Sequence, residues 1–259
     1  MRLLHSLLLT AILFASLVQT PAFATSRLDG IRARGTLRVG TTGDYAPFTL
    51  RDPTTHDLSG FDIEQARALA AMLGVSVTFV DTTWKTLAAD LAADRFDIAM
   101  GGVSVTADRA ATGAFSLPYV HDGKTPIARC TDVSRYDTIA QIDRPETRVV
   151  VNPGGTNERF ARNHFPAAQI RVVQDNRLVF DEIAEGRADV MVTDASETRL
   201  QARRHPGVLC AIHPDAPFEP LDKAYWFAKD EAFKAAVDTW MTRSRTDGSF
   251  AARAARWLD

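Results

Sequence analysis

Short runs of β-branched and other apolar residues alternate along the chain with segments whose apolar residues recur at helical spacing. Strands that alternate with amphipathic helices are typical of a mostly parallel sheet covered by helices. In the first half, the predicted strands are residues 37–40, 75–80 and 96–100, and the predicted helices are residues 61–73 and a segment marked by Trp84, Leu87 and Leu91. This half is therefore predicted to form one α/β unit.

The same alternation starts again in the second half. The predicted strands are residues 148–152, 170–173 and 188–193, and the predicted helices are residues 157–165 and 179–185. Apolar anchors from Phe233 to Trp257 predict a helical tail over residues 233–258. The pattern thus predicts a second α/β unit after about residue 124.

Two extended segments, residues 124–128 and 224–228, lie at the ends of the second unit. Two crossings indicate that the chain leaves the first lobe and later returns to it. We predict lobe 1 from residues 25–124 plus 222–259, and lobe 2 from residues 125–221. Such a molecule closes on a ligand by bending its two hinge strands.

The N-terminus has the pattern of a secretory signal peptide. Arg2 and His5 precede an almost entirely apolar run over residues 7–18, and small residues at 22 and 24 complete a cleavage site. We predict that residues 1–24 are removed after Ala24, leaving an exported protein with no membrane partner. A membrane anchor is the alternative, but the apolar run is shorter than the roughly 20 residues that a span needs.

Charge and cysteine content narrow the partners and the compartment. The formal net charge of −2 gives no broad basic surface, so we expect a small ligand or another protein rather than nucleic acid. The pair Cys130 and Cys210 predicts a structural disulfide, because such bonds persist in oxidising compartments. No Cys/His cluster has zinc-ligand spacing, and no metal is expected.

Two segments that follow predicted strands have the residue types of an anion site. Ser104 and Arg109 combine a hydroxyl and a guanidinium near a helix start, which suits a carboxylate; a plain helix cap is the alternative. The turn at residues 152–158 contains Gly155 and Thr156, where a backbone free of Cβ atoms can approach a ligand before a helix begins.

Tyr45 and Trp84 each follow a predicted strand, and each is either a flat wall of a ligand site or an ordinary core aromatic. Asp194 and Glu197 follow a third strand. If a helix begins there, the two acids share a face and raise each other's pKa, so that one of them holds a proton near neutral pH. A helix N-terminus with its usual acids is the alternative.

With these residues in hand, the chain resembles the periplasmic solute-binding proteins for polar amino acids. The resemblance rests on residues 43–48 (GDYAPF), 60–64 (GFDIE), 96–98 (FDI), 104–109 (SVTADR), the Gly-Gly-Thr turn and Ala188-Asp189 leading to Asp194. It implies a two-lobed, periplasmic-binding-protein-like (type II) α/β fold with two hinge strands. In that family the Arg holds an α-carboxylate, and the Asp at the position of Asp194 holds an α-amino group.

The chain is similar over nearly its whole mature length to the cyclohexadienyl dehydratases, enzymes built on the same scaffold. The shared stretches are residues 41–45 (TTGDY), 94–100 (DRFDIAM), 122–127 (DGKTPI), 151–158 (VNPGGTNE), and 193–195 (TDA) with Glu197. This resemblance implies a periplasmic lyase that converts prephenate to phenylpyruvate and L-arogenate to L-phenylalanine, without a cofactor. It also suggests self-association.

The resemblance assigns roles to individual residues. Glu197 matches the family's catalytic glutamate and is expected to protonate the leaving hydroxyl. Arg109 and Lys124 are candidates for the two carboxylates, Asn157 for a hydrogen bond near the reacting end, and Asp194 for the amino group of arogenate. The alternative function is an amino-acid-binding receptor of an ABC transporter, which needs no such set of Glu197, Asn157 and Lys124.

Overall fold

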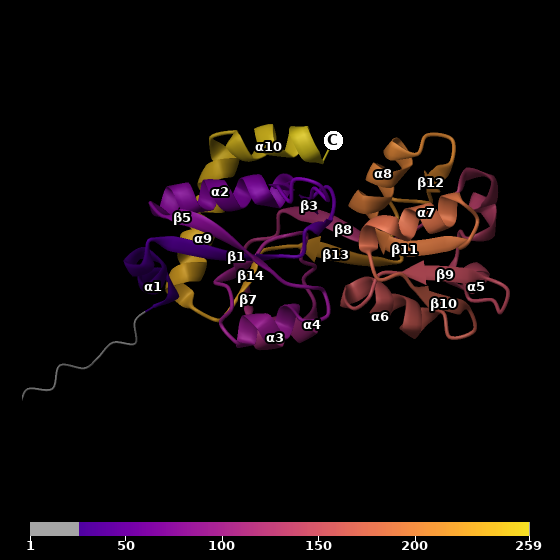
Figure 1. Cartoon of the computed structure of the whole chain (residues 1–259), viewed down its shortest axis with the longest axis horizontal. Coiled ribbons are helices and arrows are strands. Elements are labelled where there is room, and N and C mark those ends of the chain that lie inside the picture. The colour runs from indigo at the N-terminus through magenta and orange to yellow at the C-terminus, as the bar shows by residue number, and fades with distance from the viewer. Residues whose placement is uncertain (1–25, 259) are drawn as a thin grey trace, which may run out of the picture.

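The computed structural model describes residues 26–258, so the predicted signal peptide at residues 1–24 lies outside the described residues. Within residues 26–258, no helix is long and apolar enough to cross a membrane. The chain folds into two α/β lobes, each built on its own sheet, with the long strand β8 (Val120–Arg129) running from one towards the other (Figure 1). The predicted two-lobed α/β architecture is confirmed.

The first lobe is built on a five-stranded sheet in the order β5-β1-β6-β14-β7. Its strands are β1 Thr36–Thr41, β5 Ser76–Asp81, β6 Ile98–Ala99, β7 Ala114–Phe115 and β14 Trp226–Phe227, and a small separate sheet holds β2 Asp44–Tyr45, β3 Thr49–Arg51 and β4 Leu58–Ser59. The helices are α1 Arg27–Arg34, α2 Phe61–Leu73, α3 Leu87–Ala92, α4 Ala107–Thr112, α9 Glu231–Thr246 and α10 Ser249–Trp257. Strand β1 pairs in parallel with β5 and β6, as the strand–helix alternation predicts.

The second lobe repeats this plan with the order β10-β9-β11-β8-β12, and β13 also pairs with β8. Its other strands are β9 Arg148–Val151, β10 Gln169–Val172, β11 Val190–Asp194, β12 Leu209–Ala211 and β13 Glu219–Lys223. The α-helices are α5 Ile139–Ile142, α6 Gly155–His164, α7 Val179–Ala184 and α8 Ala195–Arg204, and the short 3₁₀ helices are η1 Cys130–Arg135 and η2 Asn176–Leu178.

Each lobe has its own hydrophobic core. Phe61, Leu69 and Ile98 belong to the cluster of the first lobe, whereas Val149 and Val190 belong to a cluster in the second. The two cores are separate, so the lobes meet at a boundary that neither core fills. The ligand site is therefore to be sought at that boundary.

The two crossings lie side by side. Strands β8 and β13 pair in antiparallel fashion, with Lys223 opposite Val120 and Glu219 opposite Lys124. Directly after β13 the chain enters β14, which belongs to the sheet of the first lobe. The predicted lobe limits fall within β8 and β13, and their exact positions stay a prediction.

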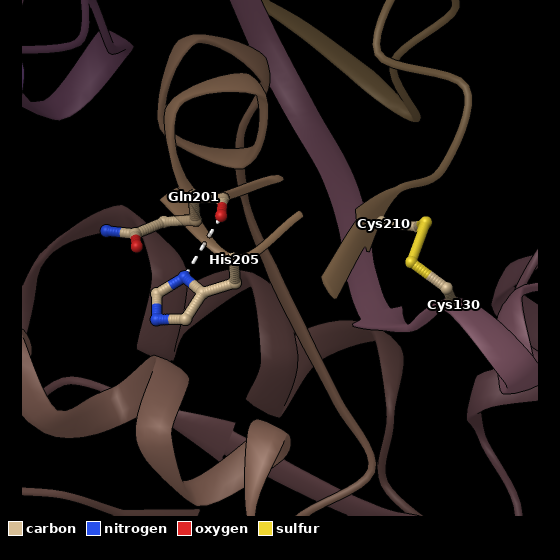
Figure 2. The surroundings of a disulfide bond; sticks show 4 residues. All are labelled: Cys130, Gln201, His205 and Cys210. Atoms are coloured by element: carbon tan, nitrogen blue, oxygen red, sulfur yellow. Dashed lines mark hydrogen bonds between the residues drawn. A yellow bond between two sulfur atoms is a disulfide. The ribbon is translucent and has the colours of Figure 1, made fainter. Parts of the chain in front are cut away.

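The predicted disulfide is confirmed, whereas the predicted tail needs a correction. Cys130 and Cys210 are bonded, with their Cα atoms 4.8 Å apart, and the bond joins strand β12 to η1 (Figure 2). The tail was predicted as helical throughout but consists of the two helices α9 and α10. They separate at Gly248, whose φ of 78° is left-handed and therefore interrupts the helix.

Candidate active site

A closed cavity lies at the boundary of the two lobes. Seven of the predicted site residues line it, namely Tyr45, Trp84, Ser104, Gly155, Thr156, Asn157 and Asp194, together with Gly102, Asn152 and Asn176. Its volume is about 20 Å³, room for roughly one water molecule. An organic ligand can enter only when the lobes move apart, as the two hinge strands allow.

Contacts across the cleft hold this closed arrangement. The side chain of Asn176 donates to the main-chain oxygen of Asp44 at 3.0 Å, and Arg159 pairs with Asp108 at 2.9 Å. The glycine turn before α6 allows the backbones of the two lobes to approach each other closely. A Cβ atom on Gly154 would lie 2.9 Å from the backbone of Lys85 in the other lobe.

Asp194 is the centre of charge in the site. It ends β11, and its side chain is buried between Lys124 on β8 and Lys223 at the end of β13. Lys124 donates to its Oδ1 at 2.7 Å, while Lys223 and the hydroxyl of Tyr45, the latter at 2.5 Å, donate to Oδ2. Burial alone would raise the pKa of Asp194, but the charges of the two lysines outweigh it and hold the pKa well below its usual range.

Glu197 lies three residues further on, in the first turn of α8, and has the opposite electrostatic state. Its side chain is only 2% exposed, and no cation pairs with it among residues 26–258. Thr193 donates to its Oε2 at 2.6 Å, which leaves Oε1 without a hydrogen bond from the described residues. Burial raises the pKa of Glu197 to about 8. The hydrogen bond from Thr193 and the charge of Lys223 oppose this shift, and the charge of Asp194 adds to it.

A chain of hydrogen bonds connects the two acids. Asn157 accepts a hydrogen bond from Lys124, and its amide nitrogen donates to Thr193 at 2.9 Å and to Asn152 at 3.2 Å. Thr193 in turn donates to Glu197. The lysine ammonium, the amide and the hydroxyl are thus held in fixed orientations relative to Glu197.

Arg109 lies in helix α4 and is not among the residues that line the cavity. Its guanidinium donates to the main-chain oxygen of Ser104 at 2.9 Å, and among residues 26–258 no carboxylate lies within 4.0 Å of it. Burial lowers the pKa of Arg109 to about 10, with a further contribution from the charge of Arg159. The guanidinium stays charged at neutral pH and has donors to spare for an anion. The alternative of a helix cap also holds locally, because Thr106 caps α4.

The family of the protein is identified by a match that extends over most of the chain. The model of the bacterial extracellular solute-binding proteins, family 3, matches residues 37–259. The chain belongs to this family. Its predicted resemblance to two-lobed binding proteins is therefore confirmed.

The relatives of this family 3 protein include both an enzyme and a binding protein. Cyclohexadienyl dehydratase from Pseudomonas aeruginosa is 48% identical over 234 residues, covering 90% of this chain and 87% of that protein. An ancestral amino-acid-binding protein, described as a precursor of cyclohexadienyl dehydratase, has a TM-score of 0.83 at 34% identity and covers 90% of this chain and 100% of its own. An ancestral cyclohexadienyl dehydratase has a TM-score of 0.57 at 49% identity, with coverages of 91% and 98%.

The structure corrects one electrostatic prediction for the family 3 site. Asp194 and Glu197 were expected to raise each other's pKa. Only Glu197 is raised, because Asp194 has two ammonium partners and Glu197 has none. Asp194 begins α8 as its N-cap residue but makes no capping hydrogen bond, since its oxygens are taken by the lysines.

Sequence reasoning missed Lys223, which is fully buried and donates to Asp194, to Ser104 at 3.0 Å and to Tyr45 at 3.4 Å. A usable signal existed. Lys223 stands directly before the second predicted crossing, just as Lys124 begins the first. Within residues 26–258 there is no group of three or more His, Cys, Asp or Glu side chains placed to hold a metal ion.

Proposed function

We propose that this protein is a periplasmic cyclohexadienyl dehydratase that acts on prephenate and L-arogenate, with Glu197 as the general acid. Loss of the ring carboxylate as carbon dioxide breaks a carbon–carbon bond, and its electron pair moves into the ring. The carbon–oxygen bond at the opposite ring position then breaks, and a proton from Glu197 lets the hydroxyl leave as water. The products are phenylpyruvate from prephenate and L-phenylalanine from L-arogenate.

The buried state of Glu197 is the observation that carries this proposal. A glutamate with a pKa of about 8 holds its proton at neutral pH and still releases it readily, as a general acid must. Its Oε1 makes no hydrogen bond within the described part of the chain. Glu197, Lys124 and Arg109 do not line the small closed cavity, so this oxygen would meet a leaving hydroxyl only after the lobes have opened to admit the substrate. A positioned acid typically contributes about 10²–10⁴-fold to the rate.

Other residues support the same reaction. Arg109 and Lys124 are proposed to hold the two carboxylates of the substrate, between walls formed by Tyr45 and Trp84. Ser104, Gly155 and Thr156 supply further donors around the cavity. Asn157 is proposed to orient Lys124 and Thr193, to which its side chain is bonded, and to contact the substrate from the wall of the cavity. Closure of the lobes would exclude water from the reacting ring.

The second candidate is an amino-acid receptor of an ABC transporter, which the ancestral amino-acid-binding relative supports. Two features of the site disfavour it. Asp194, the expected partner of an α-amino group, is already bonded to two lysines, and a protonated glutamate has no use in simple capture of an anion.

The decisive experiment mixes protein purified after export with prephenate and follows phenylpyruvate by its absorbance in base. Steady turnover without added cofactor is expected. No turnover, together with tight calorimetric binding of an amino acid, would establish the receptor instead. The mass of the same exported protein tests cleavage after Ala24, and its size in solution tests the proposed self-association.

A further inference from the structure

The buried cluster of Asp194, Lys124 and Lys223 bears on which substrate the site prefers. Lys124 and Lys223 come from the two hinge strands and are 1% and 0% exposed. Each ammonium group has three donors, and each has three partners in the closed structure. The cluster is therefore a preformed array of donors around a single carboxylate.

An α-ammonium group finds at most one acceptor position still open on the carboxylate of Asp194. A carboxylate offers about four acceptor positions, and three of those on Asp194 are taken, by Lys124, Lys223 and Tyr45. The side-chain oxygen of Asn157 is occupied by Lys124. An ammonium ion brought to Asp194 would also lie beside two others, and such like charges repel strongly where water is excluded.

Other carboxylates do not replace Asp194 in this role. The carboxylate of Asp44 accepts from the indole of Trp84 at 3.1 Å. Asp122 accepts from the hydroxyl of Ser196 at 2.6 Å. Glu197 is uncharged when it acts as the proposed acid. An α-keto oxygen, by contrast, only accepts hydrogen bonds, so it can replace the hydroxyl of Thr156 on Lys124 or that of Ser104 on Lys223.

The charge count favours the keto acid as well. Among the groups proposed to contact the substrate, three are cations, Arg109, Lys124 and Lys223, and one is an ionised carboxylate, Asp194, an excess of two positive charges before the neighbouring Asp44 and Asp122 are counted. Prephenate carries two carboxylates and no cation, so its charge matches this excess. L-Arogenate adds an ammonium group and has only one net negative charge.

We propose that Lys223, together with Lys124, makes this site selective for an α-keto acid over the corresponding α-amino acid, so that prephenate is preferred to L-arogenate. Lys223 is the determinant because it brings a second positive charge to Asp194 and shares Oδ2 of that carboxylate with the hydroxyl of Tyr45. Lys223 thus acts as a specificity residue, because it pairs with the carboxylate of Asp194, which the α-amino group of an amino acid would need. The inference rests on the proposed dehydratase function and deepens it.

The test compares kcat/KM for prephenate and L-arogenate in the wild-type protein, in Lys223→Met and in Lys229→Met. Wild type should favour prephenate by at least about tenfold. Lys223→Met should lower this ratio by at least about tenfold, because it removes one ammonium group from Asp194 and vacates the position on Oδ2 that Lys223 fills beside Tyr45. Lys229 is exposed and donates only to the main-chain oxygen of Ala111, so its variant is the matched control and should keep the wild-type ratio.

The outcomes separate the two proposals. Turnover of neither substrate by wild type overturns the dehydratase function itself. Turnover of both with equal kcat/KM, or an unchanged ratio in folded Lys223→Met, overturns only the selectivity. Should Lys223→Met fail to fold, product inhibition of wild type decides. Phenylpyruvate should inhibit at a concentration at least about tenfold lower than L-phenylalanine, and equal inhibition overturns the inference.

Discussion

Asp194 and Glu197 lie three residues apart at the start of one helix, are equally buried, and have opposite electrostatic states. Asp194 is 2% exposed and remains ionised between two lysines. Glu197 is also 2% exposed, but its partner is a hydroxyl and its pKa is about 8, so it is protonated at neutral pH. Burial penalises both charges to begin with. The groups that contact each carboxyl, and not how deeply it is buried, therefore decide which acid is an anion and which is a proton donor.

The largest effect should come from removing the proton at Glu197. Glu197→Gln keeps the shape and the neutral state but has no acidic proton, so turnover of prephenate should fall by about 10²–10⁴-fold. Circular dichroism and thermal unfolding should match wild type. The control Glu146→Gln changes an exposed glutamate just before β9 and should keep full activity. Near-normal turnover in Glu197→Gln would remove Glu197 from the mechanism.

A second test removes the negative charge of Asp194. Asp194→Asn leaves two buried ammonium groups without a counter-charge, so the free energy of unfolding should fall by about 3–5 kcal/mol. Urea unfolding at neutral pH measures it. Asp215→Asn, which breaks an exposed pair with Arg199, is the control and should cost less than about 1 kcal/mol. Equal losses of unfolding free energy in the two variants would mean that the buried lysines do not need Asp194 as their counter-charge.

A third test uses pH. Glu197 must be protonated to act, so kcat should fall as pH rises through about 8, by roughly tenfold between pH 7 and 9. Asp194 stays ionised throughout this range and adds no step there. Pre-steady-state or steady-state rates over this range, at saturating prephenate, are the measurement. A rate that is flat between pH 7 and 9 would show that the rate-limiting step does not involve the proton on Glu197.

The smallest expected effect concerns the hydroxyl that contacts Glu197. Thr193 donates to the carboxylate and so opposes the upward shift of its pKa. Thr193→Val should move the alkaline limb of the pH–rate profile upward by about one unit, the equivalent of one hydrogen bond. Thr198→Val alters a neighbouring buried hydroxyl that bonds Thr125 and the main chain, and it serves as the control. A downward shift in Thr193→Val would reverse the assigned role of the hydroxyl.

Much of the fold could be predicted because its signals are local. Helix α2 has its predicted limits, since apolar residues at helical spacing run from Phe61 until Gly74 ends the helix with a left-handed conformation. Helix α1 was missed because only Ile31 is buried in it, which leaves almost no apolar periodicity to detect. The break at Gly248 was missed because a lone glycine in a helical pattern does not say whether the chain turns there.

The sequence by itself determined the α/β alternation, the two crossings, the disulfide and most of the residues around the cavity, because each depends on spacing along the chain or on the resemblance carried by short motifs. Only the tertiary structure decided which of the two acids is ionised and which is protonated. Lys124, Asp194 and Lys223 lie on three strands, and their pairing arises where β8, β11 and β13 meet in one sheet. A pKa depends on distances in space, so nothing in the spacing of Asp194 and Glu197 could reveal which of them would meet the lysines.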